Sequence, residues 1–143
     1  MLSIETARKL KAAGLEWHPA LHDFFAIPEH GLDDRIFVIA DLPANLAMFQ
    51  GQQVFTFEGA AEWAMDYIVT TEAVWLPTES QLRQAVEART PDTPVLLSIS
   101  PDGYECSIVF RPDAAVSFRA TSAEEAYAQA LLFLLQHQKP TSA

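Results

Sequence analysis

The chain has 143 residues, of which nineteen are acidic and nine are basic, so its formal net charge is −10. Half of the residues are hydrophobic, and a single cysteine, Cys106, is present. This composition excludes a disordered tail, a collagen-like fibre and a disulfide scaffold. No apolar run approaches the roughly 20 residues that a membrane-spanning helix needs. The length predicts one soluble domain over residues 1–143.

Two features bear on the compartment. Residues 1–5 have neither the basic nor the apolar region of a signal peptide. A lone cysteine cannot form an internal disulfide, which fits a reducing compartment. We therefore expect a cytoplasmic protein.

The distribution of cations bears on the partners. Nucleic-acid binding draws most of its free energy from cations that neutralise phosphates. Here only Arg8, Lys9 and Lys11 form a local positive group. Direct binding of nucleic acid or of an anionic membrane surface is therefore disfavoured. The acidity serves either solubility or a basic protein partner, which long-range attraction would steer toward it.

The first half of the chain predicts one helix and several short strands. The helix spans residues 4–13, with Ser3 as its N-cap and Gly14 as its stop. Alternating apolar residues predict a strand over residues 35–41, central in its sheet. A short helical stretch follows over residues 44–49. A short strand is possible over residues 23–27, residues 53–57 have the pattern of a strand, and residues 73–76 are a short apolar stretch. Residues 60–67 fit either a helical turn or a strand.

The second half is more regular. Thr78 and Gln81 have the spacing of a capping box and predict the start of a helix. Three antiparallel strands are predicted over residues 95–99, 104–110 and 115–120, with a tight turn at residues 100–103. Ser122 and Glu125 repeat the capping-box spacing before a closing helix over residues 123–138. Residues 138–143 are expected to be a frayed tail.

These elements predict an α+β fold. It consists of a mainly antiparallel sheet, an N-terminal helix, a central helix and a long C-terminal helix packed on the sheet. The C-terminal helix has an unusually broad apolar face. Either it is buried on more than one side, or it forms the contact of a homodimer.

Histidines and carboxylates concentrate in residues 18–34. Imidazole and carboxylate together suit zinc or iron, so His18, His22 and His30 are the candidate metal ligands. The spacing matches no standard motif, because Pro19 interrupts the helix turn that would bring His18 and His22 to one face. The alternative is that these histidines lie at the surface or are satisfied by neighbours.

Other catalytic patterns are weak. Glu58, Glu62 and Asp66 have i, i+4 spacing and could hold a cation, although such carboxylates more often form a solvated face. Cys106 alternates with apolar residues and is expected to be a small buried hydrophobe. No glycine-rich phosphate loop and no nucleophile elbow is present. The sequence therefore identifies no catalytic residue and no cofactor-binding residue.

Three tryptophans are many for this length. Each indole combines a large apolar body with an N–H that needs an acceptor. Most such residues lie in or around a core, and an exposed one would anchor a protein contact. The candidate interaction residues are Trp17, Trp63 and Trp75.

Two resemblances add to these patterns. The first spans most of the chain and rests on Leu15-Glu16-Trp17-x-Pro19, Asp23-Phe24-Phe25, Val74-Trp75-Leu76-Pro77 and the segment from Ser122 to Leu132. These motifs resemble a group of small, uncharacterised bacterial proteins that are often phage- or prophage-associated. No activity is established for that group, so the resemblance implies no functional residue.

The second resemblance covers residues 95–135. Two strands across an Asp-Gly turn, a third strand and a helix opened by Thr121-Ser122-x-Glu124-Glu125-Ala126 are similar to HicB-type antitoxins. This resemblance implies a β-β-β-α core that binds a small basic toxin. The chain departs from that pattern, because Arg111-Pro112-Asp113 replaces the usual turn before the third strand and no basic DNA-binding segment follows.

The charge, the tryptophans and the lack of a catalytic motif together favour a non-enzymatic binding protein with an acidic surface. A toxin-neutralising protein is the first alternative. A small metal-dependent hydrolase that uses His18, His22 and His30 is the second.

Overall fold

The computed structural model describes residues 1–28, 32–39, 44–57 and 67–137. Its contacts group the chain into two compact units. The two-segment unit consists of residues 1–15 and 77–143, and the inserted unit consists of residues 16–76. The expectation of one domain over residues 1–143 stays a prediction.

The two-segment unit begins with α1 (Ile4–Ala12), close to the predicted range. Ser3 is its N-cap, and the Ser3 hydroxyl accepts a hydrogen bond from the backbone N–H of Thr6 at 3.2 Å. After the helix, Gly14 has a φ of 103°, a conformation that a glycine adopts without the strain of a side chain. The helix buries Ala7 and Leu10.

The second helix, α2 (Glu79–Arg89), starts with the predicted capping box. Thr78 accepts a hydrogen bond from the backbone N–H of Gln81, whose side chain in turn accepts one from the backbone N–H of Thr78. Two N–H groups that the helix leaves free are thereby satisfied. The buried face of α2 consists of Leu82 and Val86.

A three-stranded antiparallel sheet follows, in the order β7 (Val95–Ser100), β8 (Gly103–Arg111) and β9 (Ala114–Ala120). Residues 95, 97 and 99 share one face with Cys106 and Ile108, which are fully buried. The opposite face carries polar pairs, among them an ion pair between Arg119 and Glu105 at 2.6 Å. The predicted strands and the turn between the first two are confirmed.

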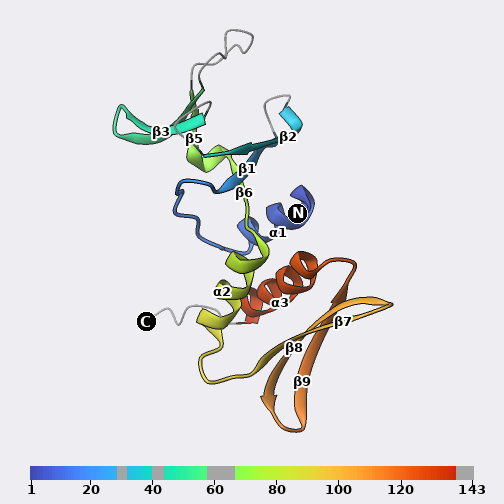
Figure 1. Cartoon of the computed structure of the whole chain (residues 1–143). Helices are drawn as coiled ribbons and strands as arrows, with labels where there is room; N and C mark the ends of the chain where they lie inside the picture. Colours follow the sequence, from blue (N-terminus) through green and yellow to red (C-terminus); the bar gives the residue numbers. More distant parts are fainter. Residues whose placement is uncertain (29–31, 40–43, 58–66, 138–143) are drawn as a thin grey trace. The chain divides into compact units, whose positions relative to one another are not determined.

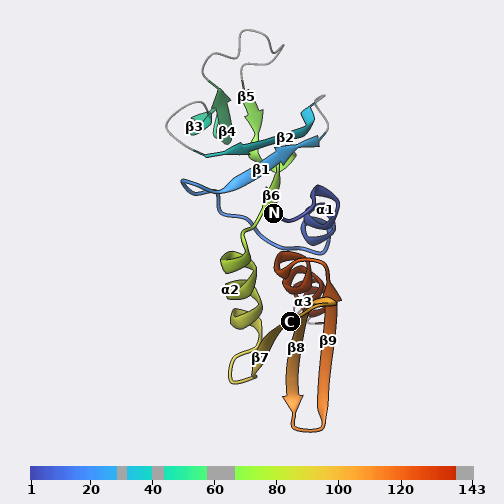
Figure 2. The same cartoon turned by 45° about the vertical axis from the view of Figure 1, so that its right-hand side comes forward.

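The closing helix α3 (Ala123–His137) is the centre of this unit. It contacts α1, α2, β8 and β9, and Figure 2 shows α2 beside it (Figures 1 and 2). These contacts explain the broad apolar face, because the helix is buried from more than one side. A homodimer contact through α3 is not needed to explain the pattern and stays a prediction. The buried residues of α3 are Ala123, Ala126, Tyr127, Ala128, Ala130, Leu131 and Leu134.

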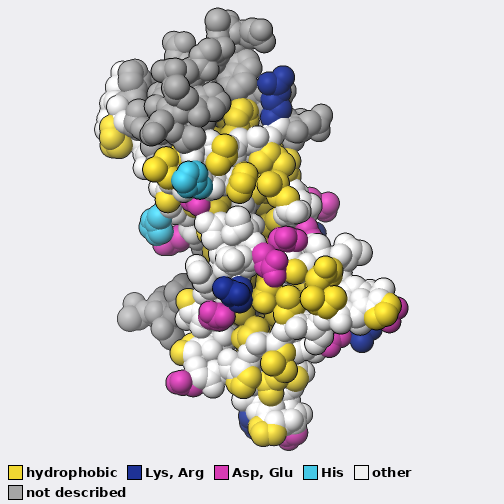
Figure 3. All heavy atoms as spheres, viewed as in Figure 1, with side chains coloured by type: hydrophobic (Ala, Val, Ile, Leu, Met, Phe, Trp, Pro, Cys, Tyr) yellow, Lys and Arg dark blue, Asp and Glu magenta, His cyan; other side chains and the backbone are white. Residues whose placement is uncertain are grey.

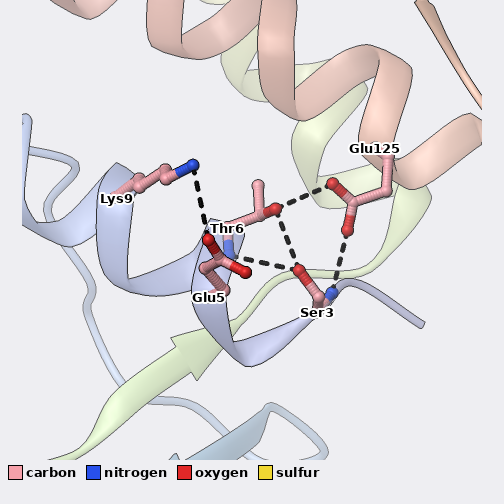
Figure 4. A network of polar contacts seen from close by, with 5 residues as sticks. All are labelled: Ser3, Glu5, Thr6, Lys9 and Glu125. Atoms are coloured by element: carbon pink, nitrogen blue, oxygen red, sulfur yellow. Dashed lines mark hydrogen bonds and ion pairs between the residues drawn. The ribbon is translucent and has the colours of Figure 1, made fainter.

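A polar network joins the two segments of this unit (Figure 4). The carboxylate of Glu125 accepts hydrogen bonds from the backbone N–H of Ser3 at 3.0 Å and from the hydroxyl of Thr6 at 2.8 Å. The sequence pattern assigned Glu125 to a capping box on its own helix, and half of that box forms, since the Glu125 N–H donates to Ser122. The Glu125 side chain instead caps the start of α1.

The inserted unit contains the sheet β2-β1-β6, with β1 (Phe24–Ile27) in the middle. The flanking strands are β2 (Leu32–Val38) and β6 (Val74–Leu76), both antiparallel to β1. The expectation that the strand near residues 35–41 is central was wrong. Its apolar residues predicted burial on both faces, but Ile36 is exposed, and the shorter β1 is the strand with a partner on each side.

A second sheet of this unit has the order β3 (Ala44–Phe49), β4 (Gln52–Phe57) and β5 (Tyr67–Val69), and a 3-10 turn, Thr70–Glu72, follows β5. The predicted helical stretch over residues 44–49 was wrong, because this segment pairs along its whole length with β4. Gln50 and Gly51 have φ values of 51° and 79° and form the hairpin turn between them. Strand pairing therefore overrides the helix propensity of alanine, leucine and methionine.

The fold is α+β, with N-terminal, central and C-terminal helices as predicted. The fully buried side chains include Leu10, Leu82, Ile108, Leu131 and Leu134 in the two-segment unit, and Phe25, Ile27, Ile39, Val54 and Leu76 in the inserted unit. Within the described ranges, no helix has the length and apolar character that crossing a membrane requires.

Candidate interaction site

Two of the three predicted interaction tryptophans stack on each other in the inserted unit. Trp17 lies in the irregular segment before β1, and Trp75 lies in β6. Their ring centroids are 6.2 Å apart and their planes differ by 5°. Phe25 of β1 is opposite Trp75 in the strand register, and its ring centroid is 6.0 Å from that of Trp17. Phe37 of β2 continues the row at 5.4 Å from Phe25, so four aromatic rings form one layer on this sheet.

A buried carboxylate holds Trp17 in this position. The indole N–H of Trp17 donates to Oδ2 of Asp23 at 2.9 Å, and the same oxygen accepts from the backbone N–H of Ala20 at 3.1 Å. Asp23 is only 6% exposed, and a buried carboxylate is tolerated when donors satisfy it. The Asp23 backbone exchanges further hydrogen bonds with Ala20 and Ile39. The segment that carries Trp17 is therefore fixed to the sheet.

The indole N–H of Trp75, the other tryptophan of the stack, differs in its hydrogen bonding. Nε1 of Trp75 is buried and has no hydrogen-bond partner in the part of the chain that the structure describes. An unsatisfied buried donor costs about 1–3 kcal/mol. The two stacked tryptophans therefore differ in the hydrogen bonding of their indole N–H groups.

The structure describes two of the three predicted metal ligands, His18 and His22, and both are exposed. The ring of His18 is 91% exposed, and its Nε2 lies 3.7 Å from a carboxylate oxygen of Glu16. His22 is exposed and has a φ of 73° in the turn before β1. His30 lies outside the described residues. Over the described ranges, no group of three or more His, Cys, Asp or Glu side chains is placed to hold a metal ion. The metal site stays a prediction.

Several other predicted residues also lie outside the described part. Trp63, Glu58, Glu62 and Asp66 all fall between residues 58 and 66, so the structure does not place them. Trp63 therefore stays a predicted interaction residue, and the carboxylate row at i, i+4 spacing stays untested.

Cys106 has the surroundings of an inert thiol. It is fully buried on the inner face of β8, and burial raises its pKa from 9.0 to about 11. Because the thiolate is the reactive form, a thiol with this pKa is a poor nucleophile near neutral pH. The prediction of a small buried hydrophobe at this position is confirmed.

The charge of the chain is concentrated in the inserted unit. Residues 16–76 contain ten acidic residues and one basic residue, Arg35, which gives a formal charge of −9. The two-segment unit has nine acidic and eight basic residues, a formal charge of −1. The acidic residues of the inserted unit are Glu16, Asp23, Glu29, Asp33, Asp34, Asp41, Glu58, Glu62, Asp66 and Glu72. The net charge of the whole chain, counted from the sequence, did not reveal that nearly all of it lies in the inserted unit.

Comparisons with known proteins add no relative: no family model, no curated protein and no solved structure matches the chain. The two resemblances stated from the sequence therefore stay expectations.

Proposed function

We propose that the protein is a non-enzymatic binding protein whose inserted unit holds a basic protein partner. The observation that supports this most directly is the formal charge of −9 on residues 16–76, against −1 on the rest of the chain. A net negative charge that served solubility alone would not need to be concentrated in one unit.

The size of the inserted unit makes this charge costly to the free protein. A compact body of this length has a radius of gyration of about 10 Å. The Debye length at physiological ionic strength is about 8 Å, so carboxylates across such a body are only partly screened from one another. Their mutual repulsion disfavours the compact state. A cationic partner would relieve that repulsion as it binds.

The inserted unit also offers apolar contact area. Leu21, Ile36 and Met48 are large hydrophobic side chains that are exposed in this unit. The Trp17–Trp75 stack gives a rigid support beneath part of the sheet. Binding energy in protein interfaces usually concentrates in a few apolar or aromatic anchors, while surrounding charges govern the association rate. A partner that combines basic and apolar side chains suits this composition.

The proposal can be tested by neutralising charges in one unit at a time. The test variant carries Glu16→Gln, Asp33→Asn, Asp34→Asn and Glu72→Gln in the inserted unit. Each tagged protein is used to retain partners from a native lysate of its source, at low and high salt, and the retained proteins are identified by mass spectrometry. We expect the wild type to retain a specific protein with a basic isoelectric point, and the test variant to lose it.

The matched control neutralises four carboxylates of the two-segment unit: Glu5→Gln, Glu87→Gln, Asp92→Asn and Asp113→Asn. This variant has the same net charge as the test variant and should keep the partner. High salt should release the partner from the wild-type protein, because salt screens the attraction between exposed charges. Equal loss in both variants, or retention of the partner in both, contradicts the proposal.

A basic toxin is a specific case of such a partner. The two-segment unit contains three antiparallel strands followed directly by a helix, β7-β8-β9-α3, which is the element order of the antitoxin core that residues 95–135 resemble. If this case applies, a neighbouring short basic open reading frame should poison cells unless this protein is co-expressed. In the family that residues 95–135 resemble, this core itself binds the toxin, whereas our proposal assigns the basic partner to the acidic inserted unit. In that assay the inserted-unit variant should therefore fail to protect, while the matched control should still protect.

A further inference from the structure

The outer edge of β7 is a surface feature that the proposed acidic docking unit does not explain. β7 ends the strand order β7-β8-β9, and within the described residues it pairs only with β8. All six of its residues pair with β8 in continuous register. The strand therefore presents a regular backbone edge with no strand beside it in the part of the chain that the structure describes.

The two edges of this sheet differ in their protection. Sheets normally guard an open edge with charged side chains or with a bulge, because an open edge pairs readily with other strands. β9 carries Arg119, and the ladder beside it is disturbed by a bulge in β8 between Val109 and Arg111. β7 has neither, and its Leu96 and Ile99 side chains are 55% and 73% exposed. An unguarded edge with exposed apolar residues is expected at a place where another strand pairs.

The hydrogen-bond pattern shows which backbone groups face outward. The backbone N–H of Val109 donates to the carbonyl of Pro94 at 3.0 Å, and residues alternate along an antiparallel pair. The backbone groups of Leu96, Ser98 and Ser100 therefore face β8. Those of Val95, Leu97 and Ile99 point away from β8, toward the open edge.

We propose that a second copy of this chain pairs its own β7 with this edge, antiparallel and about a two-fold axis through Leu97. In this register Leu97 pairs with the partner's Leu97, and Val95 pairs with the partner's Ile99. All three outward residues of each copy then exchange backbone hydrogen bonds. The register also places Ile99, the most exposed apolar residue of β7, beside an apolar residue on the same face of the joined sheet.

The charge of the two-segment unit permits this contact. β7 carries no charged side chain, and the nearest carboxylate in the register, Glu105 opposite Ser98, is already paired with Arg119. The unit as a whole is almost neutral, with both signs interspersed over the face that Figure 3 shows. Two inserted units, at −9 each, would repel each other, so the near-neutral unit is where two copies can meet.

The contact area sets the expected strength. A single pair of six-residue strands buries less than the roughly 1,600 Å² of a standard interface, so the dimer should be weak, with a dissociation constant on the order of 10–100 µM. Sedimentation equilibrium of the full chain should show a concentration-dependent dimer in this range. A chain that stays monomeric at about 1 mM overturns the proposal.

A charge on the edge should break the dimer. Ile99→Lys places a cation opposite the partner's Val95 and should weaken dimerisation about tenfold or more. Ala115→Lys is the matched control, because Ala115 is an exposed residue on β9, the far edge, and should leave the dimer unchanged. Circular dichroism checks that both variants fold. A dimer that survives Ile99→Lys, or a dimer lost equally in both variants, contradicts pairing through β7.

Disulfide trapping tests the register. Leu96 and the partner's Ser98 would form a non-hydrogen-bonded pair with Cα atoms about 4.5 Å apart, within the range that a disulfide spans. Leu96→Cys and Ser98→Cys proteins are mixed and oxidised with copper phenanthroline in air, while buried Cys106 stays reduced. The mixture should give more cross-linked dimer than either variant alone. Equal yields in all three samples would mean random collision and contradict the register.

Discussion

Glu125 completes the N-cap at Ser3, a residue 122 positions before it in the chain. Its carboxylate accepts a hydrogen bond from the backbone N–H of Ser3, the N-cap residue of α1, and another from the hydroxyl of Thr6 (Figure 4). In a capping box, the residue at the third helical position supplies the acceptor for the N-cap N–H. Here that position is Thr6, and Glu125 of α3 supplies the acceptor instead. The contact joins the two chain segments that make up the two-segment unit.

Removing this carboxylate should destabilise the protein. We expect Glu125→Ala to lower the free energy of unfolding by about 1–2 kcal/mol, because two hydrogen bonds to an ionised acceptor are lost at a helix end. The measurement is urea denaturation followed by circular dichroism. Glu124→Ala is the control, since it removes a carboxylate from the same first turn of α3 but none of these hydrogen bonds. Equal effects of the two substitutions would show that Glu125 acts only through its charge.

The two stacked tryptophans should respond differently to the same substitution. Trp17→Phe removes a donor to buried Asp23, whereas Trp75→Phe removes an indole N–H that has no partner among the described residues. Both changes remove comparable ring area. Trp17→Phe should therefore destabilise the protein by about 1–2 kcal/mol more than Trp75→Phe. Chemical denaturation of the two variants side by side measures the difference, and an equal or reversed order contradicts the assignment.

A side chain at Gly103 should destabilise the protein more than a side chain at Gly14. Its φ is 125°, and a Cβ atom at this position would lie 2.7 Å from the carbonyl oxygen of Ala120. Gly14 has a similar φ of 103° but has nothing within 4 Å of its Cβ position. Gly14→Ala should therefore cost about 1 kcal/mol of backbone strain. Gly103→Ala should cost clearly more, since the contact is with backbone. Thermal unfolding compares them, and equal losses would contradict the close contact.

The buried thiol should make the protein less stable at alkaline pH. Burial raises the pKa of Cys106 from 9.0 to about 11. Between these values the unfolded chain loses the thiol proton while the folded chain keeps it, so rising pH favours unfolding. The contribution of the protonated thiol to the free energy of unfolding is fully present below pH 9. It is lost by about pH 11, a loss on the order of 2–3 kcal/mol.

Cys106→Ala provides the comparison for this pH dependence. The variant should be less stable at neutral pH, because it leaves a small cavity, but its stability should fall less steeply between pH 9 and 11. Burial also raises the pKa of Tyr127, so part of the alkaline decline should remain in the variant. Identical slopes in the two proteins would show that the Cys106 thiol does not contribute.

Metal content separates the binding protein from the hydrolase alternative. The ring of His18 is nearly fully exposed and lies beside Glu16, an arrangement that does not enclose a cation. Protein prepared without a metal-affinity tag should therefore contain well under one equivalent of zinc or iron by elemental analysis. A full equivalent that disappears in a His18→Ala, His22→Ala double variant would instead support a metal site in residues 18–34.

Several local signals in the sequence were interpreted correctly, because the interactions behind them join residues that are close along the chain. The Ser3 cap, the Thr78–Gln81 capping box and the turn before Gly103 all join groups close along the chain. Non-local pairing decided the rest. Residues 44–49 form a strand because β4 lies beside them, and the Glu125 side chain points to α1 because α3 packs there. Trp17 and Trp75 are 58 positions apart, so only the sheet could show that they stack.

The distribution of charge likewise depends on the tertiary structure as well as on the sequence. The sequence by itself determined a net charge of −10 and an α+β fold. Divided along the sequence, the charge looks even, with −6 on residues 1–71 and −4 on residues 72–143. Only the tertiary structure showed that residues 1–15 belong with residues 77–143, which leaves −9 on the inserted unit. Charges act through space, so their grouping depends on which segments fold together.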